Sequence, residues 1–184
     1  RLLLIGRRKD LSENNKLAKF EDAIMPHFDA AYNLARWLTR SDIEAEDIVQ
    51  ESYLRAFKFY GGFRGENSRA WILRIVRNTF YSSVKNYRPT ECIDDVGEEV
   101  RGKDSADPEV ILMESINEHQ LKTMLEELPD EFREAIVLRE IEGLSYREIA
   151  EIADVPLGTV MSRIARARQR LQSGAISVLN GGAL

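Results

Sequence analysis

Residues 143–163, Gly-Leu-Ser-Tyr-Arg-Glu-Ile-Ala-Glu-Ile-Ala-Asp-Val-Pro-Leu-Gly-Thr-Val-Met-Ser-Arg, carry the end of one helix, a short helix, a turn and the start of another helix. Gly143 predicts a helix end, because glycine readily adopts the left-handed backbone conformation of a C-terminal cap. Ser145 and Glu148 are spaced for a reciprocal capping box, which opens the short helix. The turn follows at residues 153–156. The stretch therefore predicts a helix-turn-helix.

The helix after that turn, from about Leu157 to Leu171, has an apolar side and a basic side. Its apolar residues recur at helical spacing and predict a buried face: Val160, Ile164, Ala167 and Leu171. Its arginines recur at a second helical spacing and predict a basic face on the opposite side: Arg163, Arg166 and Arg170. Such a face suits phosphates and base edges in a major groove. A solvated arginine face on a surface helix is the alternative.

Composition limits the class of protein. The chain has 184 residues, 43% hydrophobic and 31% charged, which is typical of a soluble protein with one large or two small domains. No apolar run approaches the ~20 residues needed to span a bilayer, and no secretory signal is expected. The single cysteine, Cys92, allows no internal disulfide and favours a reducing compartment. With only His27 and His119 beside it, we expect neither a metal site nor a cofactor.

Basic charge is concentrated in two segments, although the formal net charge is −5. Residues 60–89 hold six basic residues against the single acid Glu66. Residues 157–171 hold four arginines and no acid. Two basic patches on an acidic chain predict contacts with DNA at two places, with acidic surfaces left for other partners.

An acidic segment at 91–111 divides the chain. Between Glu91 and Glu109 there are eight acids against Arg101 and Lys103, and few apolar residues, so the segment cannot fold alone. We find no convincing strand pattern and expect an all-α protein of two small helical domains joined by this flexible linker, the C-terminal one containing the helix-turn-helix. The expected divisions are an N-terminal arm at 1–19, a domain at 20–90, the linker at 91–111, a domain at 112–174 and a tail at 175–184.

The N-terminal domain is expected to contain three or four helices. Pro26 bends or restarts the first helix, and Ser41 with Glu44 forms a capping box for a helix from Ile43 to about Phe59. After a glycine-rich loop at 61–65, Asn67 or Ser68 caps the next helix. In the C-terminal domain, one helix passes from Ile116 to Leu128 and another runs from Pro129 to Ile141.

The helix from Ile43 to Phe59 has two unlike sides. Helical spacing places acidic and amide groups and a leucine on one side: Asp47, Gln50, Glu51 and Leu54. Small or apolar residues occupy the other side: Ala45, Val49, Ser52 and Ala56. The first set is a candidate docking face for a basic partner helix, and a merely solvated acidic face is the alternative.

Aromatic residues alternate with cations around the glycine-rich loop and the following helix. Single-stranded DNA binding needs this mixture, because bases stack on aromatic rings while cations attract phosphates. The candidate residues are Phe63, Arg64, Asn67, Trp71, Arg74, Arg77 and Asn78. Trp71 has the spacing of a core residue as well. For duplex DNA the candidates lie at the turn and on the basic helix: Pro156, Gly158, Thr159, Ser162, Arg163, Arg166 and Arg170.

Three blocks of the sequence together resemble a bacterial sigma factor of the extracytoplasmic-function type, group IV of the sigma-70 superfamily. They are residues 47–57, 63–79 and 128–163. The resemblance implies that the first block docks on the β′ clamp coiled coil of core RNA polymerase. It implies that the second captures a base flipped from the −10 element and aids promoter melting. The third is implied to bind the −35 element, with the β flap as a further polymerase contact.

The resemblance predicts a promoter-specificity subunit that is not an enzyme, since no site gathers a nucleophile with a base. An anti-sigma factor is an expected partner. The expected location is the bacterial cytoplasm, without membrane insertion, or the membrane surface through an anti-sigma factor. Two alternatives stay open: a sigma-like decoy that sequesters an anti-sigma factor, and a stand-alone helix-turn-helix regulator.

Overall fold

A computed structural model describes residues 15–65, 67–87 and 118–181. The described residues are helical with short connections and include no strand, as the sequence predicts. The chain forms two compact units, Arg1–Pro89 and Thr90–Leu184. No helix in the described ranges is both long enough and apolar enough to cross a membrane.

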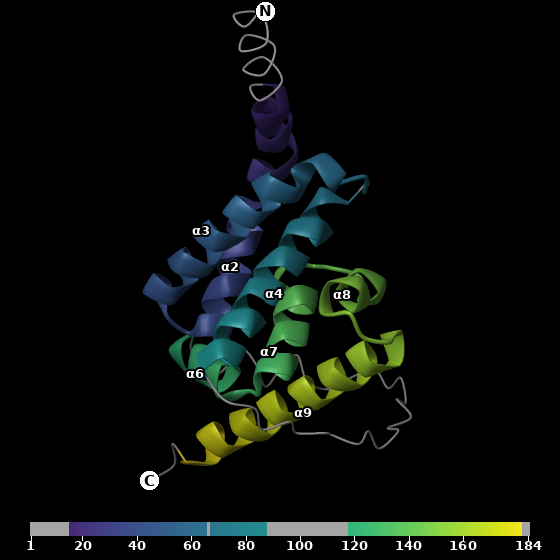
Figure 1. The fold of residues 1–184 in the computed structure, drawn as a ribbon. Helices are drawn as coiled ribbons and strands as arrows, with labels where there is room; N and C mark the ends of the chain where they lie inside the picture. The colour runs from purple at the N-terminus through teal and green to yellow at the C-terminus, as the bar shows by residue number, and fades with distance from the viewer. Residues whose placement is uncertain (1–14, 66, 88–117, 182–184) are drawn as a thin grey trace, which may run out of the picture. The chain divides into compact units, whose positions relative to one another are not determined.

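The N-terminal unit is a bundle built around three helices that pack against one another (Figure 1). After a helix at residues 15–24, its elements are the 3-10 turn η1 (Met25–His27), α2 (Phe28–Thr39), α3 (Asp42–Phe59), η2 (Tyr60–Gly62) and α4 (Ser68–Tyr87). The core of this unit includes the fully buried side chains of Ile24, Leu34, Ile72, Leu73 and Val76. Burial of such side chains is the main stabilising contribution to the bundle.

Local sequence accounts for the helix ends in this unit. Pro26 lies in η1 and interrupts the helix there, as predicted. Arg40 ends α2 in the left-handed conformation, with φ of 61°. The Ser41 hydroxyl accepts a hydrogen bond from the Glu44 amide at 3.4 Å and caps α3. Of the two caps expected for α4, the structure selects Asn67, whose Oδ1 accepts from the Ala70 amide at 2.9 Å.

The C-terminal unit contains the predicted helix-turn-helix. Its elements are α6 (Glu118–Glu127), α7 (Asp130–Ile136), which continues as a π-helical turn η3 (Val137–Ile141), α8 (Tyr146–Ala153) and α9 (Leu157–Gly181). Gly143 has the expected positive φ of 67°, and Ser145 forms the full capping box with Glu148. Asp154, at φ of 56°, turns the chain between α8 and α9. Long α9 packs against both α7 and α8.

Two helices extend beyond the expected bounds. The first begins by residue 15, inside the arm expected at 1–19, where the Lys19 carbonyl accepts a hydrogen bond from the Tyr60 hydroxyl at 2.8 Å. The last helix, α9, continues past Leu171 through the expected tail at 175–184 as far as Gly181. Ala175 is buried there, beside Gly174, where an added Cβ would lie 3.2 Å from the Met124 methyl carbon. Contacts to distant residues, which helical periodicity does not reveal, hold both extensions.

The expected linker at 91–111 and residues 1–14 lie outside the described residues. Ile116, expected on the first helix of the C-terminal domain, and Cys92 lie outside them as well.

Candidate functional site

Helix α3 presents the expected outward stripe. Asp47, Gln50, Glu51 and Leu54 are all exposed, and Leu54 keeps 61% of its surface accessible. The opposite side of the helix is buried, as predicted: Ala45, Val49, Ser52 and Ala56. The predicted exposed side and the predicted buried side of α3 are therefore both confirmed.

The structure adds Ile43 to this stripe. Its side chain is 76% exposed, and it precedes Asp47 by one helical turn, on the same side of α3. The i, i+4 spacing was the signal available in the sequence. Together these side chains form the α3 stripe: Ile43, Asp47, Gln50, Glu51 and Leu54. A stripe with polar groups between two exposed apolar side chains can offer both hydrogen bonds and hydrophobic contact.

An apolar groove of about 610 Å³ borders the α3 stripe, a feature that sequence reasoning missed. Its lining comes from η1, α2 and α3: Met25, Phe28, Tyr32, Glu46, Val49, Gln50 and Tyr53. Burial, with a smaller effect of Asp29, raises the pKa of Tyr53 to about 12. The walls of the groove belong to different helices, so the groove exists only through the packing of these helices, which periodicity within one helix does not reveal.

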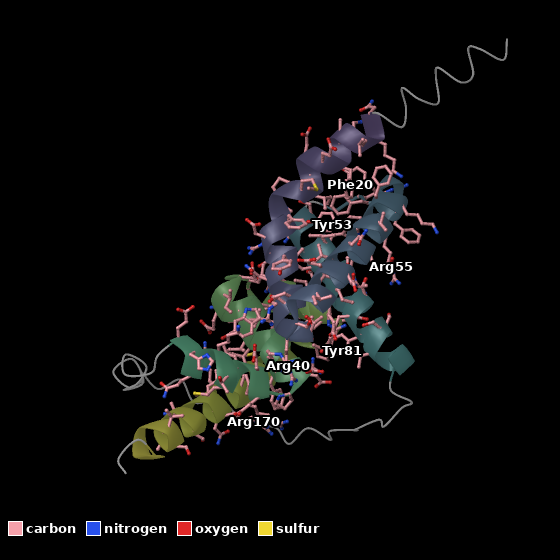
Figure 2. All side chains as sticks on the ribbon, turned by 90° about the vertical axis from the view of Figure 1, so that its left-hand side faces the viewer. Phe20, Arg40, Tyr53, Arg55, Tyr81 and Arg170 are labelled. Carbon is pink, nitrogen blue, oxygen red and sulfur yellow. The ribbon has the colours of Figure 1, made fainter. Side chains whose placement is uncertain are left out.

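Aromatic rings fix the loop that precedes α4. Phe63 stacks on Tyr60 at 6.0 Å between ring centroids and lies 4.7 Å from Trp71. Tyr60 also meets Phe20 of the first helix edge-on at 5.3 Å. Figure 2 shows Phe20 close to Tyr53 of α3, and their centroids are 6.3 Å apart. The half-buried Phe63 and Trp71 thus take part in a continuous aromatic cluster (Tyr60, Phe63 and Trp71).

The glycines of this loop are not equivalent. A Cβ added at Gly65 would lie 3.1 Å from the Phe63 ring, whereas Gly61 and Gly62 face open space. Gly65 therefore allows the backbone to approach the ring closely. Arg64, which lies between Gly62 and Gly65 in the loop, is exposed.

On α4 the candidate residues line one exposed side. Arg74 and Asn78 are exposed, and the Arg77 guanidinium lies 4.7 Å from the Tyr81 ring centroid. Arg77 also donates a hydrogen bond to Asn78 Oδ1 at 3.4 Å. At the start of the helix, His27 Nε2 lies 3.0 Å from the Ser68 hydroxyl, which ties η1 to α4. Desolvation by burial and then the Arg69 charge lower the pKa of His27.

At the start of α9 the candidate polar residues are accessible. Pro156 and Gly158 are exposed, while Thr159 and Ser162 are half-buried. The Ser162 hydroxyl donates to the Thr159 carbonyl at 2.9 Å, so it already has a partner within the helix. Pro156 accepts from the Thr159 amide at 3.0 Å.

The sequence predicted the arginines of α9 on the side opposite its buried face, but two of them, Arg163 and Arg170, contact α7. Arg163 pairs with Glu131 of α7 at 2.9 Å, and its side chain is only 16% exposed. Arg170 is exposed, and its guanidinium lies 5.3 Å from the ring centroid of Phe132 on α7 (Figure 2 labels Arg170). Arg166 is half-buried. Arg163 and Arg170 each directly precede a buried residue, Ile164 and Leu171, and so lie on the flank of the helix. Long arginine side chains there can fold onto the neighbouring helix.

Two family models match the chain, one on each unit. Sigma-70 region 2 matches residues 23–90, and sigma-70 region 4 matches residues 118–171. The N-terminal match covers α2, α3 and α4, and the C-terminal match ends inside α9.

Relatives that match more than three quarters of the chain agree with these two family models. An ECF RNA polymerase sigma-E factor of Haemophilus influenzae is 40% identical over 151 residues, which cover 76% of this chain and 78% of that protein. An ECF RNA polymerase sigma factor SigE of Mycolicibacterium smegmatis is 35% identical over 85% of this chain and 61% of its own length. The sigma factor RpoE of Bartonella quintana, solved in complex with the anti-sigma factor NepR, is 32% identical with a TM-score of 0.66. That likeness covers 85% of this chain and 96% of the solved one.

Proposed function

This chain belongs to the extracytoplasmic-function sigma factors of the sigma-70 family, and we propose how its two units share the work of promoter recognition. The N-terminal unit docks on core RNA polymerase and captures the opened −10 element, and the C-terminal unit binds the −35 element as duplex DNA. The observation that carries this division is the order of the two matched regions on two separately compact units. As a member of this family, the chain is a transcription initiation factor rather than an enzyme.

The α3 stripe is the proposed polymerase contact. Asp47 supplies negative charge, and Glu51 adds a carboxylate that also pairs with Arg55 within α3, at 2.6 Å. Gln50 supplies both a donor and an acceptor, and the three together suit a basic partner helix such as the β′ clamp coiled coil. Ile43 and Leu54 lie on the same exposed side and give such a helix apolar area to cover. Charge complementarity then favours fast encounter, and the apolar contacts favour a long-lived complex.

The loop at 63–65 and the start of α4 are the proposed contact for single-stranded −10 DNA. Arg64, Arg74 and Asn78 are exposed beside the half-buried Phe63 and Trp71. Partly accessible rings among cations suit a base that has left the duplex stack, because the ring stacks on the base and the cations meet its phosphates. Asn67 and Arg77 complete the proposed set, and each already supports α4 through a hydrogen bond.

The N-terminal end of α9 is the proposed contact for the −35 duplex. Pro156, Gly158, Thr159 and Ser162 form its accessible start, and Arg166 follows one turn later. A helix N-terminus favours phosphate, and an arginine reads guanine in the major groove. Each unit is expected to bind its DNA element weakly. The covalent connection then makes the second contact intramolecular, which raises the overall affinity.

Regulation by an anti-sigma factor follows from the same surfaces. Any protein that covers the α3 stripe or the start of α9 competes with polymerase or with DNA. The sigma factor RpoE of Bartonella quintana was solved in complex with the anti-sigma factor NepR. We propose that this chain acts in the bacterial cytoplasm and is retained there, or at the membrane surface, by an inhibitor of this kind.

The first test is a pull-down of purified core RNA polymerase with this chain, followed by run-off transcription from genomic fragments. We expect complex formation and new transcription start sites, whose alignment gives the two promoter elements. Duplex DNA binding without polymerase binding would instead indicate a stand-alone regulator. Loss of both, with retained binding of an anti-sigma factor, would indicate a decoy.

A further inference from the structure

Arg163 of α9 forms an ion pair with Glu131 of α7, so its charge is used within the protein. Their nitrogen and oxygen atoms are 2.9 Å apart, and the arginine side chain is only 16% exposed against 55% for the glutamate. The arginine side chain is therefore largely shielded from water, and the Glu131 carboxylate lies where it compensates the charge. An arginine held in this way has to break a charged contact before it can reach a phosphate.

A second contact links the same two helices. Arg170, two turns after Arg163, lies over the ring of Phe132, the residue that follows Glu131. Phe132 itself is buried, so the ring has a fixed position. One flank of α9 is thus attached to α7 at two points that lie seven residues apart on α9.

We propose that Glu131 is a positioning residue for promoter recognition: through Arg163 it fixes the orientation of α9 on α7. This proposal rests on the proposed binding of the −35 duplex by α9. In this role Arg163 serves as a brace within the protein and supplies no phosphate contact. Loosening the brace lets α9 tilt, which weakens contacts that need exact geometry more than it weakens general attraction to phosphates.

The chain offers a matched control on the same helix. Arg168 pairs with Glu140 of η3 at 2.7 Å, but both side chains are 50% exposed. An exposed pair of this kind contributes little, because water and salt screen it. Replacing Arg168 changes the charge of α9 by the same amount as replacing Arg163, but it breaks an exposed ion pair and not a shielded one.

The experiment measures holoenzyme binding to two duplexes: one selected by the wild-type holoenzyme from a random-sequence pool, and a scrambled version of it. We expect Glu131→Gln and Arg163→Gln each to lower the ratio of the two affinities by about two- to fivefold, in line with a partly buried ion pair. The dependence of affinity on salt concentration should keep its slope in Arg163→Gln. Glu140→Gln and Arg168→Gln should leave the ratio unchanged.

A charge swap separates a brace from a DNA contact. If the pair is a brace, Arg163→Glu alone loses selectivity, and Arg163→Glu combined with Glu131→Arg recovers it. If Arg163 instead meets a phosphate, the swapped protein stays impaired, because a glutamate then faces DNA. Arg163→Gln would in that case weaken binding to both duplexes alike and reduce the salt slope by about one. Either of these results would overturn the proposal.

Urea unfolding of the full chain tests the brace without DNA. A double-mutant cycle over Glu131 and Arg163 should show coupling, and the Glu140 and Arg168 cycle should show almost none. If the wild type selects no duplex but the first cycle shows coupling, the proposed −35 binding has failed while the brace between α7 and α9 stands. No coupling in the first cycle refutes the brace itself.

Discussion

Helices α3 and α9 both carry charged residues at helical spacing, yet their charged side chains end in different places. Those of α3 project outward beside the exposed Ile43 and Leu54. On α9, Arg163 and Arg170 turn back onto α7, against Glu131 and Phe132. Where a charged side chain ends depends on its length and on how far around the helix its residue lies from the buried face. A short carboxylate opposite the core stays in water, whereas a long arginine on the flank reaches the next helix.

The largest expected effect concerns Arg133, which is the extreme case of an arginine turned inward. Its fully buried guanidinium donates to the carbonyls of Glu126 and Leu128 at 3.1 and 2.5 Å and pairs with Asp130. Arg133→Met should lower the free energy of unfolding by roughly 3 kcal/mol, since it leaves these acceptors without a donor. Urea denaturation measures this change. Arg168→Met, at a half-exposed site, is the control and should change it by less than about 0.5 kcal/mol.

A charge reversal on the outward side tests the α3 stripe. Asp47→Arg with Glu51→Arg should weaken polymerase binding by roughly 2 kcal/mol, about thirtyfold, because like charges then face a basic helix. The melting temperature should stay close to that of the wild type, since both positions are exposed. Holoenzyme formation measured by fluorescence anisotropy gives the affinity. The control is Glu21→Arg with Asp22→Arg, an equal charge change at two exposed acids on the first helix. Equal losses in both variants would refute a specific docking face.

The apolar ends of the stripe should contribute less than its charges. Ile43→Ser and Leu54→Ser should each weaken polymerase binding by about 1–2 kcal/mol, in proportion to the apolar area that the partner covers. Neither change should destabilise the folded chain, because both side chains are mostly exposed. Phe59→Ser alters another exposed apolar side chain of α3 and should leave polymerase affinity unchanged. A similar loss in Phe59→Ser would widen the docking surface beyond the stripe.

The smallest expected effect is on the inward flank of α3, at Tyr53. Its raised pKa of about 12 means that the unfolded chain ionises first as the pH rises above 10. Stability should therefore fall between pH 10 and 12. Because the side chain is only half-buried, solvent screening reduces the expected loss to roughly 1 kcal/mol. Tyr53→Phe should remove this part of the slope in urea denaturation between pH 9 and 12. Parallel curves for the two proteins would contradict the assignment.

Much of the architecture followed from local signals in the sequence. The capping box at Ser145 and Glu148, the left-handed Gly143 and the interruption at Pro26 all occur in the structure as predicted. The buried face of α9 was predicted as well, because helical periodicity identifies the side that faces the core. These features depend on backbone geometry within a few residues, which the sequence alone determines.

Other features depended on residues far apart in the chain. The first helix receives a hydrogen bond from Tyr60 at Lys19, and the extension of α9 past Leu171 lies against Met124 at Gly174. The groove beside the α3 stripe needs the placement of α2 against α3. Asn67 became the cap of α4 by the geometry of its loop, where the sequence allowed Ser68 equally.

The sequence by itself determined the all-α class, the two helical units, the helix-turn-helix and the outward side of α3. It did so because helix periodicity and capping are local. Only the tertiary structure decided where the arginines of α9 point and how Phe63 and Trp71 share one cluster. A long side chain can reach several neighbours, and its position depends on which helix lies within reach. Periodicity specifies the direction in which a side chain leaves its helix, and the fold decides what it meets.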